Sequence, residues 1–158
     1  MRKRGPGKIG VAWAVRGRPL SDRAVRAAVR AALAHGRRTG LDVDVALVSD
    51  RRLAAIHGRF LGDPSPTDVI AFELGSDGGG PAAEVYVSVD CARRVARELE
   101  VDAAGELRLY LVHGALHLCG YDDVRPADRR RMRAAEASVL AALRGARGRR
   151  PYRKNGKT

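Results

Sequence analysis

The fold and its chemistry are organised around residues 113–123, which read HGALHLCGYDD. His113 and His117 are four residues apart, so on a helix their side chains project from one face. Gly120 is the residue type that ends a helix in a left-handed conformation and turns the chain back. Asp123 follows three residues later and can return beside the two imidazoles. Two nitrogens and one carboxylate oxygen converging in this way predict a tetrahedral metal site with an open fourth position, which is typical of catalytic sites.

The helix that carries the two histidines is expected to begin after Asp102, a favourable N-cap residue. Its apolar side chains point in almost every direction around the axis, which is typical of a buried helix. Histidines there need polar partners, because an unpaired buried polar group costs about 1–3 kcal/mol. A bond from each imidazole to a carbonyl or carboxylate would meet that need without a metal. The paired spacing, with the glycine and carboxylate that follow, favours a metal.

The histidine spacing also equals that of the metzincin proteases, whose motif is HExxHxxGxxH. In those enzymes the glutamate is the general base for the zinc-bound water, and this chain has Gly114 in its place. Because glycine cannot carry a proton, a metzincin-like peptidase is an alternative that keeps the metal geometry but lacks the base.

The same stretch resembles HGxLHLxGYDH, the signature of the YbeY family of single-metal endoribonucleases that act on ribosomal RNA in bacteria and organelles. Every fixed letter matches except the last, where the family usually has a histidine and this chain has Asp123. A carboxylate is an accepted zinc ligand, although it should leave the bound water less acidic than a third imidazole would. Asp122 matches the family's aspartate. If the third ligand is not Asp123, His57 and Asp122 are the next candidates.

Three further segments are similar to motifs of that family. Residues 66–72, PTDVIAF, resemble P-T-[DN]-V-L-S-F, and residues 83–88, AEVYVS, resemble the strand motif G-[DE]-[IV]-x-[IV]-S with Ala83 in place of the glycine. Residues 56–61, IHGRFL, resemble L-N-x-x-[YF]-x, in which many members have an arginine at the position of Leu61. Arg59 is the nearby candidate for the phosphate contact that this arginine would make.

The last predicted helix, from about residue 126 to 143, carries Glu136 on its apolar stripe. A carboxylate is seldom left unpaired when buried. Met132 and Glu136 also match the M-x-x-x-E that the family has after its histidine signature. Two interpretations stay open: Glu136 orients a ligand histidine, or it pairs at the rim with one of the arginines between residues 129 and 133.

Hydrophobic periodicity and capping residues predict the other elements. The predicted strands cover residues 9–15, 43–48, 67–72 and 84–89; the predicted helices follow Ser21 as far as Gly36, Ser49 or Asp50 as far as residue 56, and Asp90. This order predicts one α+β domain with a small mixed four-stranded sheet covered by helices and the metal site on a central buried helix. The resemblance implies the same fold. The order of the strands does not follow from the pattern.

The net charge of +12 over 158 residues is concentrated at the two ends. Four basic residues lie in the first eight positions and six more follow Ala146, with no acid in either stretch. We therefore expect a basic N-terminal arm over residues 1–8, a single catalytic domain over 9–146, and a basic, disordered C-terminal tail over 147–158. Such arms commonly bind a polyanion, although arms that serve only solubility are the alternative.

Composition also bears on the cellular compartment. The chain has no apolar run of about 18 residues that would span a membrane, and its basic start lacks the apolar segment of a secretory signal. Cys91 and Cys119 do not make a disulfide framework, so both are predicted to be small core residues in a reducing cytoplasm.

The family resemblance implies a zinc-dependent, single-strand-specific endoribonuclease that matures the 3′ end of 16S ribosomal RNA and acts in ribosome quality control. RNA is the expected partner, and no small-molecule cofactor is expected. His113, His117 and Asp123 would hold one Zn²⁺, Asp122 and Glu136 would orient ligands, and Arg59 would contact phosphate. The residues themselves support hydrolysis by a metal-bound water. Two further alternatives are a ribosome-assembly factor with a structural metal and a hydrolase of small phosphorylated substrates.

Overall fold

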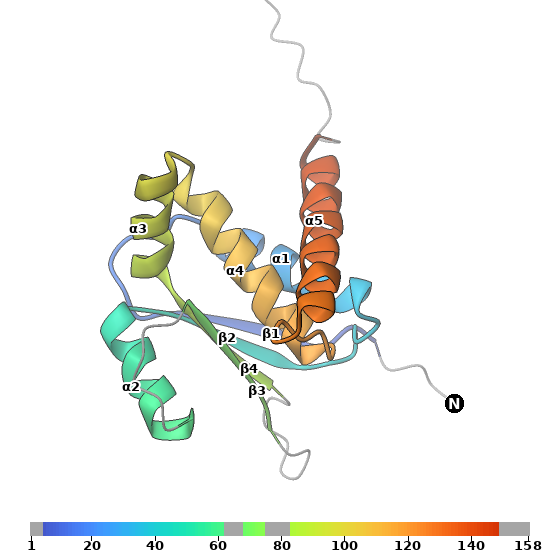
Figure 1. The fold of residues 1–158 in the computed structure, drawn as a ribbon, viewed down its shortest axis with the longest axis horizontal. Coiled ribbons are helices and arrows are strands. Elements are labelled where there is room, and N and C mark those ends of the chain that lie inside the picture. Colours follow the sequence, from blue (N-terminus) through green and yellow to red (C-terminus); the bar gives the residue numbers. More distant parts are fainter. Residues whose placement is uncertain (1–4, 62–67, 75–82, 149–158) are drawn as a thin grey trace, which may run out of the picture.

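The computed structural model describes residues 5–61, 68–74 and 83–148. Within these ranges the chain forms a mixed sheet and helices, which confirms the predicted α+β class (Figure 1). The elements in chain order are β1 (Ile9–Trp13), α1 (Asp22–His35), β2 (Val43–Val48), α2 (Asp50–Leu61), β3 (Val69–Glu73), β4 (Ala83–Ser88), α3 (Val89–Leu99), α4 (Ala103–Leu118) and α5 (Pro126–Gly148). No helix in the described ranges combines the length and apolar character that a membrane span needs.

The sheet has four strands in the order β1-β2-β4-β3. The first three strands in this order run parallel, with Val45 paired to Val11 on one side and to Val85 on the other. The edge strand β3 is antiparallel to β4, and Ala71 lies opposite Val85. Parallel neighbours need a crossover connection, which α1 supplies between β1 and β2. The mixed sheet is as predicted, and the strand order is new information.

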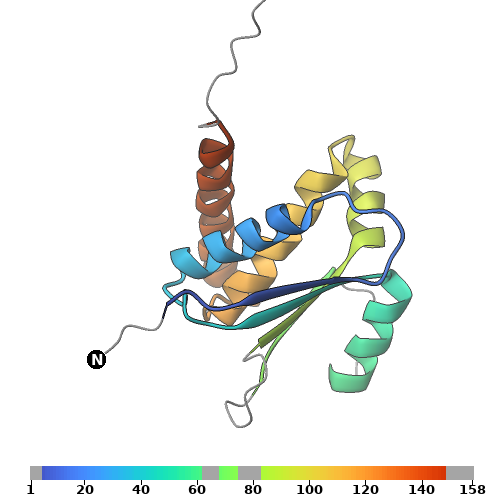
Figure 2. The same cartoon turned by 180° about the vertical axis from the view of Figure 1, so that it is seen from behind.

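Helices cover the two faces of the sheet unequally. On one face, Val43, Val45 and Leu47 point into the main core that α1 and α4 complete, while α5 packs against both of these helices. On the other face, α2 packs over a smaller cluster that includes Ile70 and Tyr86. Figures 1 and 2 show α1, α4 and α5 gathered on one side of the sheet and α2 on the other. The helix that carries the two histidines, α4, therefore lies on the face of the sheet that holds the main core.

The central position of α4 confirms the prediction of a buried helix. It contacts α1, α3, α5, β3 and β4, and its side chains Leu107, Leu111 and Leu116 are fully buried. The helix begins at the predicted cap, where the Asp102 carboxylate accepts a hydrogen bond from the backbone N–H of Ala104 at 3.1 Å. Burial on all sides leaves only a narrow strip of α4 on which a functional group can meet solvent.

Two predicted helix starts have different outcomes. Ser21 caps α1 as predicted, accepting from the backbone N–H of Ala24. The prediction that Asp90 caps α3 was wrong: the Ser88 hydroxyl accepts from the backbone N–H of Cys91 at 3.0 Å, and α3 begins at the next residue. Asp90 instead accepts from the backbone N–H of Asp50. Both residue types can cap, and the nearby start of α2 engages Asp90.

Other boundaries also differ from the prediction. The first strand ends at Trp13 rather than at residue 15, and α2 continues to Leu61, beyond the predicted residue 56. The last helix continues to Gly148, since Ala and Arg favour helix and residues 144–148 contain no proline. The predicted tail over 147–158 therefore starts inside α5, while 149–158 and the first four residues lie outside the described ranges.

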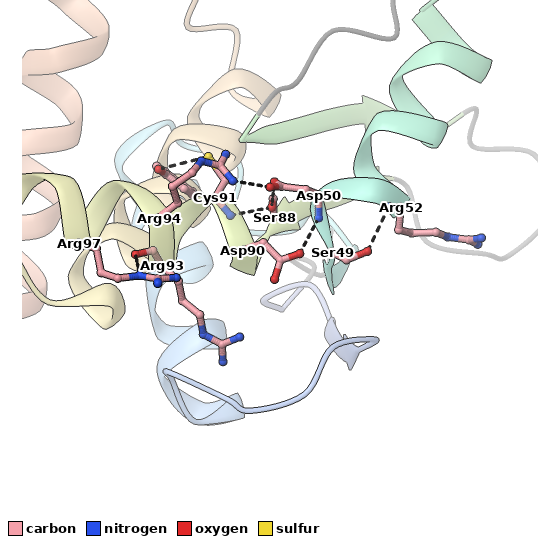
Figure 3. A network of polar contacts seen from close by, with 10 residues as sticks. Ser49, Asp50, Arg52, Ser88, Asp90, Cys91, Arg93, Arg94 and Arg97 are labelled. Atoms are coloured by element: carbon pink, nitrogen blue, oxygen red, sulfur yellow. Dashed lines mark hydrogen bonds and ion pairs between the residues drawn. The ribbon is translucent and has the colours of Figure 1, made fainter.

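A polar network joins the start of α2 to the end of β4 and to α3 (Figure 3). The buried Ser88 hydroxyl donates to the Asp50 carboxylate at 2.6 Å, and the Arg94 guanidinium donates to its other oxygen at 2.5 Å. Burial alone would raise the pKa of Asp50, but these two hydrogen bonds and the charge of Arg94 hold that pKa below its ordinary value of 3.8.

We expect Asp50→Asn to reduce how steeply the free energy of unfolding falls as the pH is lowered. A carboxyl with a lowered pKa contributes stability that is present above its unfolded value, here 3.8, and is lost as the pH falls through the folded-state pKa. At pH 7 the substitution should cost about 0.5–1 kcal/mol, because solvent screens this partly exposed pair. Urea unfolding between pH 3 and 7 measures both effects. An equal acid slope in the variant and the wild type would contradict the prediction.

Candidate metal centre

Three potential ligand atoms converge at the C-terminal end of α4. The Nε2 atoms of His113 and His117 are 3.0 Å apart, and Asp123 Oδ2 lies 3.3 Å from the first and 3.7 Å from the second. Ligands bound to zinc at 2.0–2.1 Å in a tetrahedron lie about 3.3 Å from one another. The three atoms therefore have the spacing of three corners of such a tetrahedron, and among the described residues this is the group that could hold an ion.

The turn after α4 brings Asp123 back to the histidines. Gly120 has a φ of 91°, a backbone conformation that residues other than glycine rarely adopt. Its N–H donates to the carbonyl of His117, and the N–H of Tyr121 donates to the carbonyl of Leu116. These two bonds form a Schellman motif, in which the last carbonyls of a helix are satisfied as the chain reverses. The prediction for Gly120 is confirmed.

Asp122 shapes the loop rather than contacting an imidazole. Its Oδ1 accepts hydrogen bonds from the backbone N–H groups of Asp123 at 2.7 Å and Val124 at 3.3 Å. This is an Asx-type turn, in which a side chain holds the backbone that follows it. Asp122 can therefore orient the candidate ligand Asp123 through its backbone, and this role stays a prediction.

Glu136 lies behind the first histidine. Its Oε1 is 2.8 Å from His113 Nδ1, and its side chain is only 15% exposed. An ionised carboxylate can only accept, so Nδ1 carries a hydrogen, and in the neutral imidazole Nε2 then presents a lone pair toward His117 and Asp123. Of the two interpretations left open, the structure shows the contact with histidine and, within the described ranges, no ion pair between Glu136 and an arginine.

The donor set fits a divalent transition-metal ion. With the hydrogen of His113 on Nδ1, its bare Nε2 faces the nearby Nε2 of His117. A cation between them would be bound by both lone pairs, and the Asp123 oxygen completes a set of two imidazoles and one carboxylate. Such a mixed nitrogen and oxygen set suits zinc and similar ions better than calcium or magnesium.

The surroundings of the histidines are acidic. Burial lowers the pKa of His113, but the hydrogen bond and charge of Glu136 and the charges of Asp68 and Asp123 outweigh burial, so the pKa is raised overall. Asp68, just before β3, was given no role in the sequence analysis. The signal that could have identified it was its match to the aspartate or asparagine of P-T-[DN]-V. Carboxylates around the histidines favour a bound cation.

Gly114 sets how closely α4 approaches the sheet. A Cβ atom on this residue would lie 2.7 Å from Cγ2 of Val69 and 3.0 Å from Cγ1 of Val85. In the sequence, Gly114 stands where the protease motif has its general base. The structure adds that the helix backbone at Gly114 lies close against β3 and β4, beside the candidate ligand His113.

The other candidate residues lie apart from this cluster. Arg59 is exposed on α2, which packs on the opposite face of the sheet, and it lines a shallow depression with Arg52 and Tyr86. His57, also on α2, has a buried Nδ1 without a hydrogen-bond partner in the part of the chain that the structure describes. The Cys119 thiol points to the carbonyl of Ala32 on α1 at 3.9 Å. The structure thus brings together the two histidines, Asp123 and Glu136.

Glu136→Gln is expected to weaken zinc binding about 10- to 100-fold, because partners that orient a ligand histidine and raise its basicity typically contribute this much. The amide preserves the volume of the side chain, so the fold should be retained. Competition with a chromogenic chelator measures the zinc affinity. Asp128→Asn, on the same helix but paired with Arg131, is the matched control and should bind zinc as the wild type does. Equal affinities of the two variants would contradict the prediction.

Comparison with known sequences identifies relatives over most of the chain. The family model described as Endoribonuclease YbeY matches residues 18–144. Proteins named Endoribonuclease YbeY from Anaeromyxobacter sp. strain Fw109-5 and Anaeromyxobacter dehalogenans are 41% and 38% identical, over 80% and 76% of this chain. The matches cover 67% and 63% of those relatives, so the chain spans about two thirds of their length. A relative of the same name from Chlorobium luteolum is 36% identical, with 80% of this chain and 91% of the relative covered.

A solved structure shares the fold. The solution structure of TM1509 from Thermotoga maritima superposes with a TM-score of 0.57 and covers 95% of this chain and 99% of its own. The two sequences are 23% identical, so this similarity shows a shared architecture of sheet and helices and nothing beyond the fold.

Proposed function

This chain belongs to the YbeY family of endoribonucleases, and from that premise we propose that it hydrolyses RNA at a metal ion held by His113, His117 and Asp123. The family model and the relatives of the same name confirm the resemblance that the sequence motifs indicated. The observation that carries the proposal is the convergence of three ligand atoms within 3.0–3.7 Å of one another. The hydrogen bond from His113 to Glu136 behind them adds support.

The residues of the site have distinct proposed tasks. Glu136 keeps the hydrogen of His113 on Nδ1 and so directs its Nε2 into the site, while Asp122 holds the backbone of Asp123. A divalent ion bound there, which we propose to be zinc, would act as a Lewis acid and lower the pKa of the attacking water. Gly114 has no proton-accepting group, which argues against the metzincin-like peptidase.

The proposed substrate is single-stranded RNA, and the proposed role is maturation of the 3′ end of 16S ribosomal RNA and ribosome quality control in the cytoplasm. The names of the relatives support RNA as the substrate class. The net charge of +12 also suits a polyanion. An ion held at the half-exposed end of α4 would be within reach of a flexible strand, whose bases and phosphates are not constrained by a duplex.

The decisive experiment combines elemental analysis with RNA cleavage. Pure protein should contain one zinc per chain and cleave a single-stranded oligoribonucleotide, should lose activity on chelation, and should regain it when zinc is restored. The same strand in a duplex should be cleaved more slowly. Zinc-loaded protein that leaves RNA intact would overturn the proposal in favour of an assembly factor. Turnover of p-nitrophenyl phosphate without RNA cleavage would favour a hydrolase of small phosphorylated substrates.

Two substitutions test Asp123 as the third ligand. Asp123→Ala should reduce zinc affinity more than about tenfold, because a two-histidine site lacks the third protein ligand typical of catalytic zinc. Asp123→His, which supplies the imidazole usual in the family, should retain zinc. Inductively coupled plasma analysis after dialysis measures the bound metal. Full occupancy in Asp123→Ala would show that the third ligand lies elsewhere.

A further inference from the structure

The positive charge within the domain is concentrated on α5. Residues 9–146 carry a net charge of only +2, yet α5, which ends two residues beyond that range, carries six arginines and two acidic residues. The arginines are Arg129, Arg130, Arg131, Arg133, Arg144 and Arg147. Both acids are engaged: Asp128 pairs with Arg131, and Glu136 bonds to His113. Most of the arginine charge of α5 is therefore not neutralised within the helix.

Two of these arginines share a face with Glu136. At 100° per residue, Arg129 lies about 20° and Arg133 about 60° around the axis from Glu136. Both residues are exposed. Long side chains on a helix lean toward its N-terminus, which for α5 is the end next to the loop that carries Asp123. The helix face that contacts the histidine site through Glu136 thus continues into two arginines.

The contacts of these arginines support this placement. The Arg129 guanidinium donates to the carbonyl of Val124 at 3.4 Å, which places its charge beside the residue after Asp123. Arg133 forms no ion pair or hydrogen bond with any residue in the described ranges. Glu136, one turn away and the nearest acid on its helix face, is occupied by His113. Both guanidinium groups can therefore bind an anion from solution.

The histidine site needs such cations if it is to admit a phosphate. Asp68, Asp123 and Glu136 bring three negative charges close to His113, and a divalent ion would not neutralise all three. A backbone phosphate would then meet net repulsion unless further positive charge lay beside it. The planar guanidinium fork matches phosphate oxygens in both geometry and charge.

We propose that Arg129 and Arg133 form the α5 wall of the substrate site and bind backbone phosphates of a single-stranded RNA next to the cleaved linkage. The inference rests on the proposed function, whose substrate site it extends. These arginines would take the place of the family arginine that is absent at Leu61, whereas Arg59 lies on the opposite face of the sheet. Arg133 is the cleaner residue to test, because Arg129 also holds the loop through Val124.

The test measures binding separately from cleavage. Zinc-loaded wild type and variants are titrated against a fluorescent single-stranded RNA with phosphorothioate linkages that resist cleavage, at several salt concentrations. Arg133→Gln should weaken binding about fivefold and reduce the slope of log K against log salt by about 0.7, the value for one lost phosphate contact on a single strand. Arg130→Gln removes the same charge from the same arginine run, about 120° around the helix from Glu136, and should stay within about twofold of the wild type.

The outcomes separate the inference from the proposed function. Equal losses of affinity and slope in Arg133→Gln and Arg130→Gln would overturn the inference even if the wild type cleaves RNA. The expected difference in binding would support it even if no cleavage is found, in which case only the proposed function fails. Arg129→Lys should bind RNA more tightly than Arg129→Gln, because the charge is retained although the fork is lost. Zinc content and melting temperature must match the wild type in every variant compared.

Discussion

His117→Ala should lower metal-dependent RNA cleavage by roughly 10³-fold or more while the chain stays folded. The substitution removes one of the three ligand atoms, so zinc should no longer be retained at the stoichiometry of the wild type. The side chain is 32% exposed, so its truncation leaves no large cavity in the core. Bound zinc, cleavage rate and thermal unfolding of the same preparations measure the three expectations together.

The folded state of that variant decides whether the metal is catalytic or structural. The main core joins the sheet to α1, α4 and α5 through fully buried side chains such as Leu33, Leu47 and Leu111. Such a core should keep the domain folded without an ion, unlike small domains whose folding depends on a metal. Unfolding of His117→Ala, or of the wild type on chelation, would favour the assembly factor. His35→Ala, at an exposed histidine, is the control and should change none of the three measurements.

Gly114→Ala should destabilise the protein by about 1–3 kcal/mol, the usual cost of adding a methyl group to a packed core. The new Cβ would lie 2.7 Å and 3.0 Å from the methyl groups of Val69 and Val85. These β-branched side chains have few alternative rotamers, so either the helix or the strands must move. Because His113 is the neighbouring residue, zinc affinity should fall as well. Urea unfolding and chelator competition measure the two effects.

Gly105 provides the matched control on the same helix. A Cβ on Gly105 would meet no atom within 4 Å, so Gly105→Ala should stabilise α4 by up to about 1 kcal/mol through its higher helix propensity. If the two substitutions change the free energy of unfolding in opposite directions, close packing rather than helix propensity makes alanine unfavourable at residue 114. A stabilising Gly114→Ala would contradict the close approach of α4 to the sheet. Gly114→Glu, which copies the protease motif, should be more disruptive still.

The central part of the fold and of the site was predictable because its signals are local. The Asp102 cap, the i and i+4 histidines, and the turn at Gly120 all lie within one helix and the turn that ends it. The strand order was not predictable, because it depends on which strands pair across long separations. The Ser88 cap was not predicted because serine and aspartate are equally suitable N-cap residues. Only the folded structure shows that the Asp90 carboxylate accepts from the backbone N–H of Asp50, which leaves the cap of α3 to Ser88.

The partners of the site were less predictable than its ligands. Glu136 had two possible kinds of partner, and only the packing of α5 against α4 shows that it meets His113. Arg59 lies within the segment that resembles the family motif, residues 56–61, but α2 packs on the other face of the sheet. The basic face of α5 was overlooked because charge was summed over segments rather than resolved by direction around a helix axis.

The three candidate ligand atoms all come from a segment of eleven residues, 113–123. Capturing an ion within so short a segment closes only a small loop, so little chain entropy is lost beyond what the helix and its turn already remove. Glu136 is the exception, since it arrives from another helix. An ion bound at this site would therefore be held by one contiguous peptide, and the docking of α5 would adjust how strongly that peptide retains it.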